Sequence, residues 1–108
     1  MSEVVGATAS GLELLERHAA AIENLCRQYG VRSLRVFGSA VQGTARPDSD
    51  LDLLVTFARP TSLLGLVRLE RELSALLGVD VDLVTERALS PYLRASILEE
   101  ARAVYEQA

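Results

Sequence analysis

Two carboxylates that lie two residues apart begin an apolar run. Asp50 and Asp52 alternate with Leu51 and Leu53 in the sequence Asp-Leu-Asp-Leu-Leu-Val. Because residues two apart on a strand point to the same face, both carboxylates are expected to project together. Two carboxylates this close repel each other unless they share a proton or a cation. Oxygen ligands of this kind favour Mg²⁺ or Mn²⁺, so the pair indicates a divalent metal site that also takes phosphate oxygens.

A second pair of this kind follows in Val-Asp-Val-Asp-Leu-Val, where Asp80 and Asp82 are again two residues apart. If this segment forms a strand beside the first one, one of these aspartates completes a three-carboxylate cluster. Such a cluster would hold two metal ions a few ångströms apart, as in phosphoryl-transfer sites. The residues alone do not separate Asp80 from Asp82, and a solvated strand residue is the alternative for either.

A Gly-Ser pair precedes the first carboxylate pair. Gly38 and Ser39 follow an apolar run, and ten residues separate them from Asp50. Glycine permits close backbone approach, exposed amides can hold phosphate, and the Ser39 hydroxyl adds a donor. In the loop between them, Arg46 is a candidate phosphate contact or a solvated arginine, and Ser49 can brace the loop through backbone amides. Joined to the aspartate pair, the turn predicts a nucleotide phosphate site.

The elements that must position these residues follow from hydrophobic periodicity and from Gly, Pro and Ser punctuation. The pattern predicts an α/β (α+β) fold, in which a small mixed sheet is flanked by helices, and a single domain over residues 1–108. The expected helices cover Ser10–Tyr29, Ser62–Leu77 and Ser90 to about Ala103, and the expected strands cover 33–37, 51–57 and Val79–Thr85, with a loop over 43–49. Residues Val104-Tyr105 either continue the last helix or form a short edge strand.

Composition excludes several classes of protein. No stretch approaches the roughly 20 apolar residues that span a membrane, and Met1–Ser10 has no secretion signal. The lone Cys26 allows no internal disulfide, which favours a reducing, cytoplasmic location. A net charge of −4 argues against direct nucleic-acid binding. The run from Arg68 to Glu72 is typical of an ordinary charged helix face.

The run from Val36 to Val55, Val-Phe-Gly-Ser-Ala-Val-Gln-Gly-Thr-Ala-Arg-Pro-Asp-Ser-Asp-Leu-Asp-Leu-Leu-Val, resembles the signature of the minimal nucleotidyltransferases, the MNT proteins of the DNA polymerase beta superfamily. The resemblance extends through Asp82-Leu83-Val84 and covers most of the chain from Leu34 onwards. It implies two Mg²⁺ ions and transfer of a nucleoside monophosphate from a triphosphate such as ATP, with release of pyrophosphate.

The resemblance also assigns roles to single residues. Gly38 and Ser39 would hold the triphosphate. Asp50, Asp52 and Asp82 would be the metal ligands, and Asp82, preferred to Asp80 for its Asp-Leu-Val context, would also activate the acceptor hydroxyl.

The same resemblance implies a partner. The large nucleotidyltransferases carry a second helical domain for the acceptor, whereas this sequence is expected to find its acceptor on another molecule. Similar proteins form toxin–antitoxin pairs with a helical HEPN ribonuclease and adenylylate a tyrosine hydroxyl of that toxin. Two alternatives remain open: a non-catalytic module that neutralises its partner by covering it, and a small-molecule nucleotidyltransferase of the aminoglycoside type.

Overall fold

A four-stranded sheet with the order β3-β2-β1-β4 forms the centre of the computed structural model, which describes residues 11–42 and 50–107. The strands are β1 (Val31–Phe37), β2 (Leu51–Phe57), β3 (Val81–Thr85) and β4 (Arg102–Glu106). β2 runs antiparallel to β1 and parallel to β3, while β4 pairs antiparallel with the other edge of β1. The mixed sheet that the sequence predicted is therefore confirmed.

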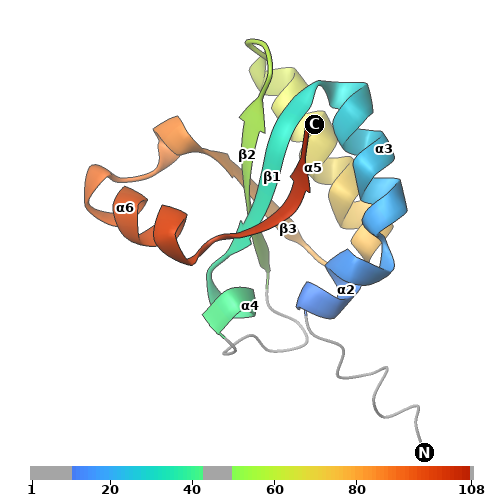
Figure 1. The fold of residues 1–108 in the computed structure, drawn as a ribbon. Helices are drawn as coiled ribbons and strands as arrows, with labels where there is room; N and C mark the ends of the chain where they lie inside the picture. Colours follow the sequence, from blue (N-terminus) through green and yellow to red (C-terminus); the bar gives the residue numbers. More distant parts are fainter. Residues whose placement is uncertain (1–10, 43–49, 108) are drawn as a thin grey trace, which may run out of the picture.

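The helices divide between the two faces of this sheet. They are α2 (Gly11–Arg17), α3 (Ala19–Tyr29), α4 (Ser39–Gln42), α5 (Leu63–Leu77) and α6 (Pro91–Glu100), with a 3₁₀ turn η1 (Glu86–Ala88) before α6. Figure 1 shows α3 and α5 side by side against one face, and α6 on the opposite side of the sheet. We call the side that carries α6 the open face.

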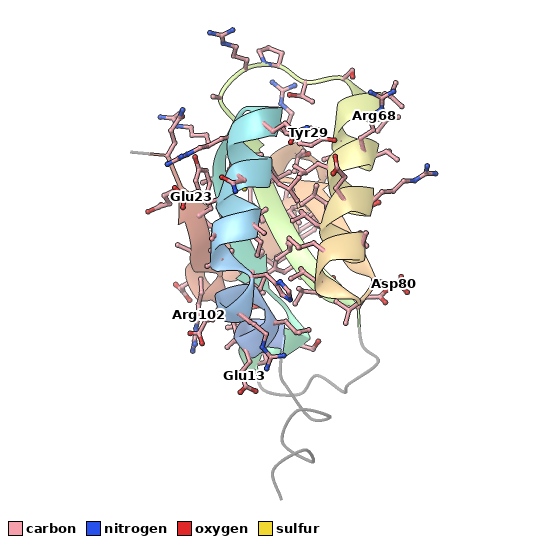
Figure 2. All side chains as sticks on the ribbon, turned by 90° about the vertical axis from the view of Figure 1, so that its right-hand side faces the viewer. Glu13, Glu23, Tyr29, Arg68, Asp80 and Arg102 are labelled. Atoms are coloured by element: carbon pink, nitrogen blue, oxygen red, sulfur yellow. The ribbon has the colours of Figure 1, made fainter. Side chains whose placement is uncertain are left out.

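The apolar core lies between the sheet and the pair α3 and α5. Alternate strand residues such as Leu34, Leu53 and Val55 meet Ile22 of α3 and Leu69 of α5, and all five are buried. At the upper end of the helix layer in Figure 2, the Tyr29 hydroxyl of α3 donates a hydrogen bond to the Glu72 carboxylate of α5. The core therefore lies on the α3 and α5 side of the sheet, opposite the open face.

Several predicted boundaries are confirmed by their caps. Ser62 caps α5 by accepting a hydrogen bond from the Gly65 amide at 3.2 Å, and Gly78 ends that helix with φ +74. Ser90 accepts from the Tyr92 amide at 3.3 Å at the start of α6. Strand β2 has the predicted bounds, and the short helix α4 begins at Ser39 of the Gly-Ser pair.

Four boundaries were predicted wrongly. The first helix is interrupted at His18, whose ψ of 20 lies outside the helical region, and its predicted first residue Ser10 lies outside the described residues. β1 begins at Val31, two residues before its predicted start at 33. β3 begins at Val81 rather than Val79, because the chain is still leaving the left-handed Gly78.

The fourth boundary is the end of the C-terminal helix. Ala101 is extended, so α6 stops at Glu100 and the next residues pair with the free edge of β1. That pairing satisfies an edge that would otherwise be exposed, and it confirms the edge-strand alternative.

Among the described residues, each helix is too short or too polar to cross a lipid bilayer.

Candidate active site

Strand β2 carries the first candidate carboxylate to the open face. Leu51 and Leu53 are buried against the helix layer, so the half-buried Asp52 between them projects to the other side. Asp50 is exposed and directly precedes the strand. Strand alternation therefore gives Asp52 the predicted direction, and Asp50 lies one residue before the strand begins.

Strand β3 brings Asp82 beside Asp52. The two residues are direct partners in the parallel ladder, where neighbouring strands lie about 4.8 Å apart. Val81 and Leu83 are buried on the helix side, so Asp82 points to the open face and is exposed there. Two aspartates that are 30 positions apart in the sequence thus become neighbours on one surface.

Two side chains of α5 fix the part of β3 that carries Asp82. The Val81 amide donates to the Ser74 hydroxyl at 3.0 Å, and the Leu83 amide donates to the Glu70 carboxylate at 2.8 Å. These bonds satisfy edge amides on both sides of Asp82. Glu70 is thus more than part of an ordinary charged helix face, and the sequence interpretation of that run was wrong for this residue.

The electrostatics of Asp52 reflect this crowding. Burial, which is the largest cause, and the negative charges of Asp82 and Asp50 raise the pKa of the Asp52 carboxyl above its usual range. Asp80 does not contribute to the shift. It lies before β3, where its backbone oxygen accepts from the Leu51 amide at 2.8 Å, and Figure 2 shows it at the outer edge of the molecule beside the end of α5. The structure therefore groups Asp52 with Asp82 and Asp50.

The Gly-Ser turn lies against the same carboxylates. Phe37, the last residue of β1, is the ladder partner of Asp52, and Gly38 follows it with φ +79. A Cβ atom on Gly38 would collide with the Asp52 carboxylate oxygen Oδ2. Glycine is therefore required here for two reasons, because its φ is left-handed and because the carboxylate of Asp52 occupies the space of a side chain. Ser39 begins α4 directly beside this contact.

A residue that the sequence analysis did not single out reaches this turn from α6. The Glu100 carboxylate accepts hydrogen bonds from the Gly38 amide at 3.2 Å and from the Gln42 side-chain nitrogen at 3.3 Å. No local signal marks Glu100, because its partners lie about 60 residues earlier in the chain. The Gly38 amide that was predicted to hold phosphate therefore already donates to a carboxylate of the protein.

Arg46 and Ser49 lie outside the described residues. Over residues 11–42 and 50–107, no three acidic, thiol or imidazole side chains converge closely enough to hold a metal ion by themselves. The donor set still fits Mg²⁺, because carboxylates that crowd each other favour a cation and Mg²⁺ completes its shell with water and phosphate oxygens. The three-carboxylate metal site stays a prediction.

Several known proteins are similar to this chain in sequence or in fold. Residues 19–104 match the nucleotidyltransferase domain family. The chain is 45% identical over 78 residues to protein adenylyltransferase MntA of Thermococcus cleftensis, a match that covers 72% of this chain and 79% of that relative.

Two solved structures are similar over most of the chain. One, assigned as a minimal nucleotidyltransferase, has 49% identity and a TM-score of 0.74, and covers 84% of this chain and 93% of its own. The other is a toxin–antitoxin crystal structure with AMP-PNP. It has 27% identity and a TM-score of 0.69, and covers 82% of this chain and 73% of its own. The chain is therefore similar in sequence to a protein adenylyltransferase and in fold to a minimal nucleotidyltransferase.

Proposed function

The chain belongs to the nucleotidyltransferase domain family, and from this premise we propose that it is an antitoxin that transfers AMP from ATP to a tyrosine of a HEPN toxin. The observation that supports the chemistry most is the register that pairs Asp52 with Asp82 beside Gly38. The identity to a protein adenylyltransferase supports a protein acceptor. The similarity to a toxin–antitoxin structure with AMP-PNP supports the partner and the nucleotide.

The proposed reaction is an in-line displacement at the α-phosphorus of ATP. The tyrosine oxygen forms a bond to that phosphorus while the bond to the oxygen that bridges to the β-phosphate breaks, so pyrophosphate leaves with the bonding electrons. The proton of the tyrosine hydroxyl passes to the Asp82 carboxylate, which is exposed on the open face and accessible to an acceptor from another chain. The products are AMP-tyrosine and pyrophosphate.

We assign the metal and phosphate contacts as the sequence motif suggests. Asp50, Asp52 and Asp82 would hold two Mg²⁺ ions, which when bound supply positive charge against the triphosphate and the charge that develops during transfer. The Ser39 hydroxyl would donate to the phosphates, together with Arg46 and Ser49. Since the Gly38 amide donates to Glu100, Gly38 contributes mainly by leaving room for the Asp52 carboxylate.

Charge supports a protein partner rather than direct contact with RNA. The net charge of −4 complements a basic, RNA-binding toxin and speeds association with it. An AMP group on the toxin adds negative charge that repels the RNA backbone, which provides a reason for neutralisation. We propose that the chain acts as a single domain in the cytoplasm.

The test is to incubate the protein with a purified HEPN partner, ATP and Mg²⁺, and to measure the intact mass of the partner. The expected result is a gain of one or more AMP units on a tyrosine, lost in Asp50→Asn, Asp52→Asn and Asp82→Asn. The matched control is Asp80→Asn, which removes a nearby exposed carboxylate that does not affect Asp52 and should keep transfer.

Other outcomes identify the alternatives. Toxin neutralisation by Asp50→Asn, with no mass change on a partner treated with the wild-type protein, would indicate a non-catalytic binding module. Transfer only to a small hydroxylated molecule would indicate an enzyme of the aminoglycoside type. If Asp80→Asn abolishes transfer and Asp82→Asn does not, the third carboxylate is wrongly assigned.

A further inference from the structure

The carboxylate of Glu100 holds the short helix α4 at both of its ends. It accepts one hydrogen bond from the Gly38 amide, directly before α4, and another from the side chain of Gln42, the last residue of α4. These two partners lie 62 and 58 residues away from Glu100 in the chain. One side chain at the end of α6 therefore spans the whole turn on which Ser39 lies.

The pairing of β4 with β1 brings Glu100 to this position (Figure 1). Val36 of β1 is the ladder partner of Arg102. Because antiparallel partners advance in opposite directions, the same register continued by two residues sets Gly38 opposite Glu100. α6 ends at Glu100, since Ala101 is already extended and leads into β4. The strand register therefore sets where this carboxylate meets the Gly-Ser turn.

Helix α4 depends on contacts with the rest of the protein for its position. It has only four residues, and a single helical turn is unstable alone because its nucleation is unfavourable. The amides of Val41 and Gln42 both donate to the Gly38 carbonyl, which closes the turn. Ala40 is buried in the apolar core and anchors one side of α4. Glu100 adds a polar anchor that holds the two ends.

We propose that Glu100 is a positioning residue for the phosphates of the nucleotide, an inference that rests on the proposed function. By holding Gly38 and Gln42, Glu100 fixes the Ser39 hydroxyl where it donates to the phosphates. A hydrogen bond weakens steeply when its geometry is poor, so a looser turn gives a weaker phosphate contact. Glu100 acts through the turn and not on the nucleotide, because a carboxylate and a phosphate repel each other. The site therefore needs the reach of Glu100 and not its charge.

The test compares two variants that separate reach from charge. Glu100→Gln keeps the length of the side chain and an oxygen acceptor for the Gly38 amide, and the Gln42 amide can turn over to accept where it now donates. Glu100→Asp keeps the charge but is one methylene group shorter, so it cannot hold both ends of α4. Glu99→Asp, the same change at the exposed neighbouring position, is the matched control.

AMP-PNP is titrated into each protein in the presence of Mg²⁺, and urea unfolding checks that each variant is folded. Glu100→Asp should lower the affinity by about 2- to 10-fold, a loss of the size of one ordinary hydrogen bond. Glu100→Gln should bind at least as tightly as the wild type, because it keeps the bonds and removes a negative charge. Glu99→Asp should bind as the wild type does. In a Ser39→Ala background, Glu100→Asp should cause no further loss, because its effect passes through the Ser39 hydroxyl.

Three results would overturn the inference. Weaker binding by Glu100→Gln together with wild-type binding by Glu100→Asp would show that the charge is needed, as for a metal ligand. An equal loss from Glu100→Asp with and without the Ser39 hydroxyl would show that Glu100 does not act through Ser39. Wild-type binding by both Glu100 variants would assign the carboxylate no role at the nucleotide site.

Two further outcomes are also decisive. If Glu100→Asp does not fold, Gln42→Ala takes its place, because it removes one of the two bonds at an exposed position, and unchanged affinity would then overturn the inference. Absence of AMP-PNP binding by the wild-type protein would overturn both this inference and the proposed function. The results of the Glu100 variants bear on this inference alone and leave the proposed function intact.

Discussion

Replacing Gly38 with alanine provides a sharp test of how the Gly-Ser turn meets the metal-ligand candidate. Gly38 and Gly78 have almost the same left-handed conformation, with φ +79 and φ +74. They differ in their surroundings, because a Cβ atom on Gly78 has no heavy atom within 4 Å, whereas one on Gly38 collides with Asp52 Oδ2 and lies 3.3 Å from its Cγ. Gly78→Ala is therefore a matched control for backbone strain alone.

The expected costs follow from this difference. A left-handed conformation costs a non-glycine residue about 1–2 kcal/mol. The stiffer unfolded chain offsets about 0.4–1 kcal/mol of that, so Gly78→Ala should lower the free energy of unfolding by about 1 kcal/mol. Gly38→Ala must also push the Asp52 carboxylate out of its rotamer, which adds about 0.5–1.5 kcal/mol. The addition is modest because only the end of a side chain has to move, but the group that moves is a candidate metal ligand.

The assay is urea unfolding in metal-free buffer, with each glycine variant also made in an Asp52→Ala background. Without the carboxylate, the collision disappears, so the excess cost of Gly38→Ala over Gly78→Ala should vanish in the double variants. In the transfer assay, Gly38→Ala should lose activity and Gly78→Ala should keep it. The reasoning is refuted if the two single variants differ by less than about 0.5 kcal/mol, the usual error of additivity, and both retain transfer.

Two further predictions concern the carboxylates and the hydroxyl of the site. Burial and the charges of Asp82 and Asp50 raise the pKa of Asp52 in the folded protein, so ionised Asp52 destabilises the metal-free fold. The stability that protonated Asp52 provides is present below the unfolded pKa and is lost as the pH rises through the folded pKa. Asp52→Asn should therefore be at least as stable as the wild type at pH 7, with the gain disappearing below the ordinary value of 3.8, as followed by urea unfolding in a chelator across pH. A variant that is less stable at pH 7 would contradict the crowding of these carboxylates. Ser39→Ala should lower the affinity for AMP-PNP by about 10- to 100-fold without loss of stability, because it removes one hydrogen bond to a charged phosphate. Unchanged affinity in an equilibrium titration would exclude the Ser39 hydroxyl from the phosphate site.

Local signals were sufficient for the elements that carry the site. β2 was predicted with its observed bounds because the apolar Leu51 and Leu53 alternate with the charged Asp52. Such alternation can be read from neighbouring residues. The end of α5 was predicted because Gly78 favours the left-handed conformation without help from the rest of the fold. The interruption at His18 was not predicted, because the apolar stripe continues across it and hydrogen bonds to Leu14 and from Ile22 span it.

Residue types and spacing selected the candidate residues of the site. Asp50 and Asp52 were paired by their separation of two, and Gly38 was recognised by its place after a strand. The sequence did not show why a side chain is excluded at Gly38. The Asp52 carboxylate that excludes it belongs to β2, which lies beside Gly38 only when β1 and β2 have paired.

Only the tertiary structure shows which residues from distant segments lie together at the candidate site. The choice between Asp80 and Asp82 depends on the register of β3 against β2, which α5 helps to set through Ser74 and Glu70. The contact of Glu100 with the Gly38 turn depends on the path of the chain between β3 and β4. Caps and periodicity act within a few residues, whereas register and crossover are set by packing between distant segments, so no local pattern could have indicated them.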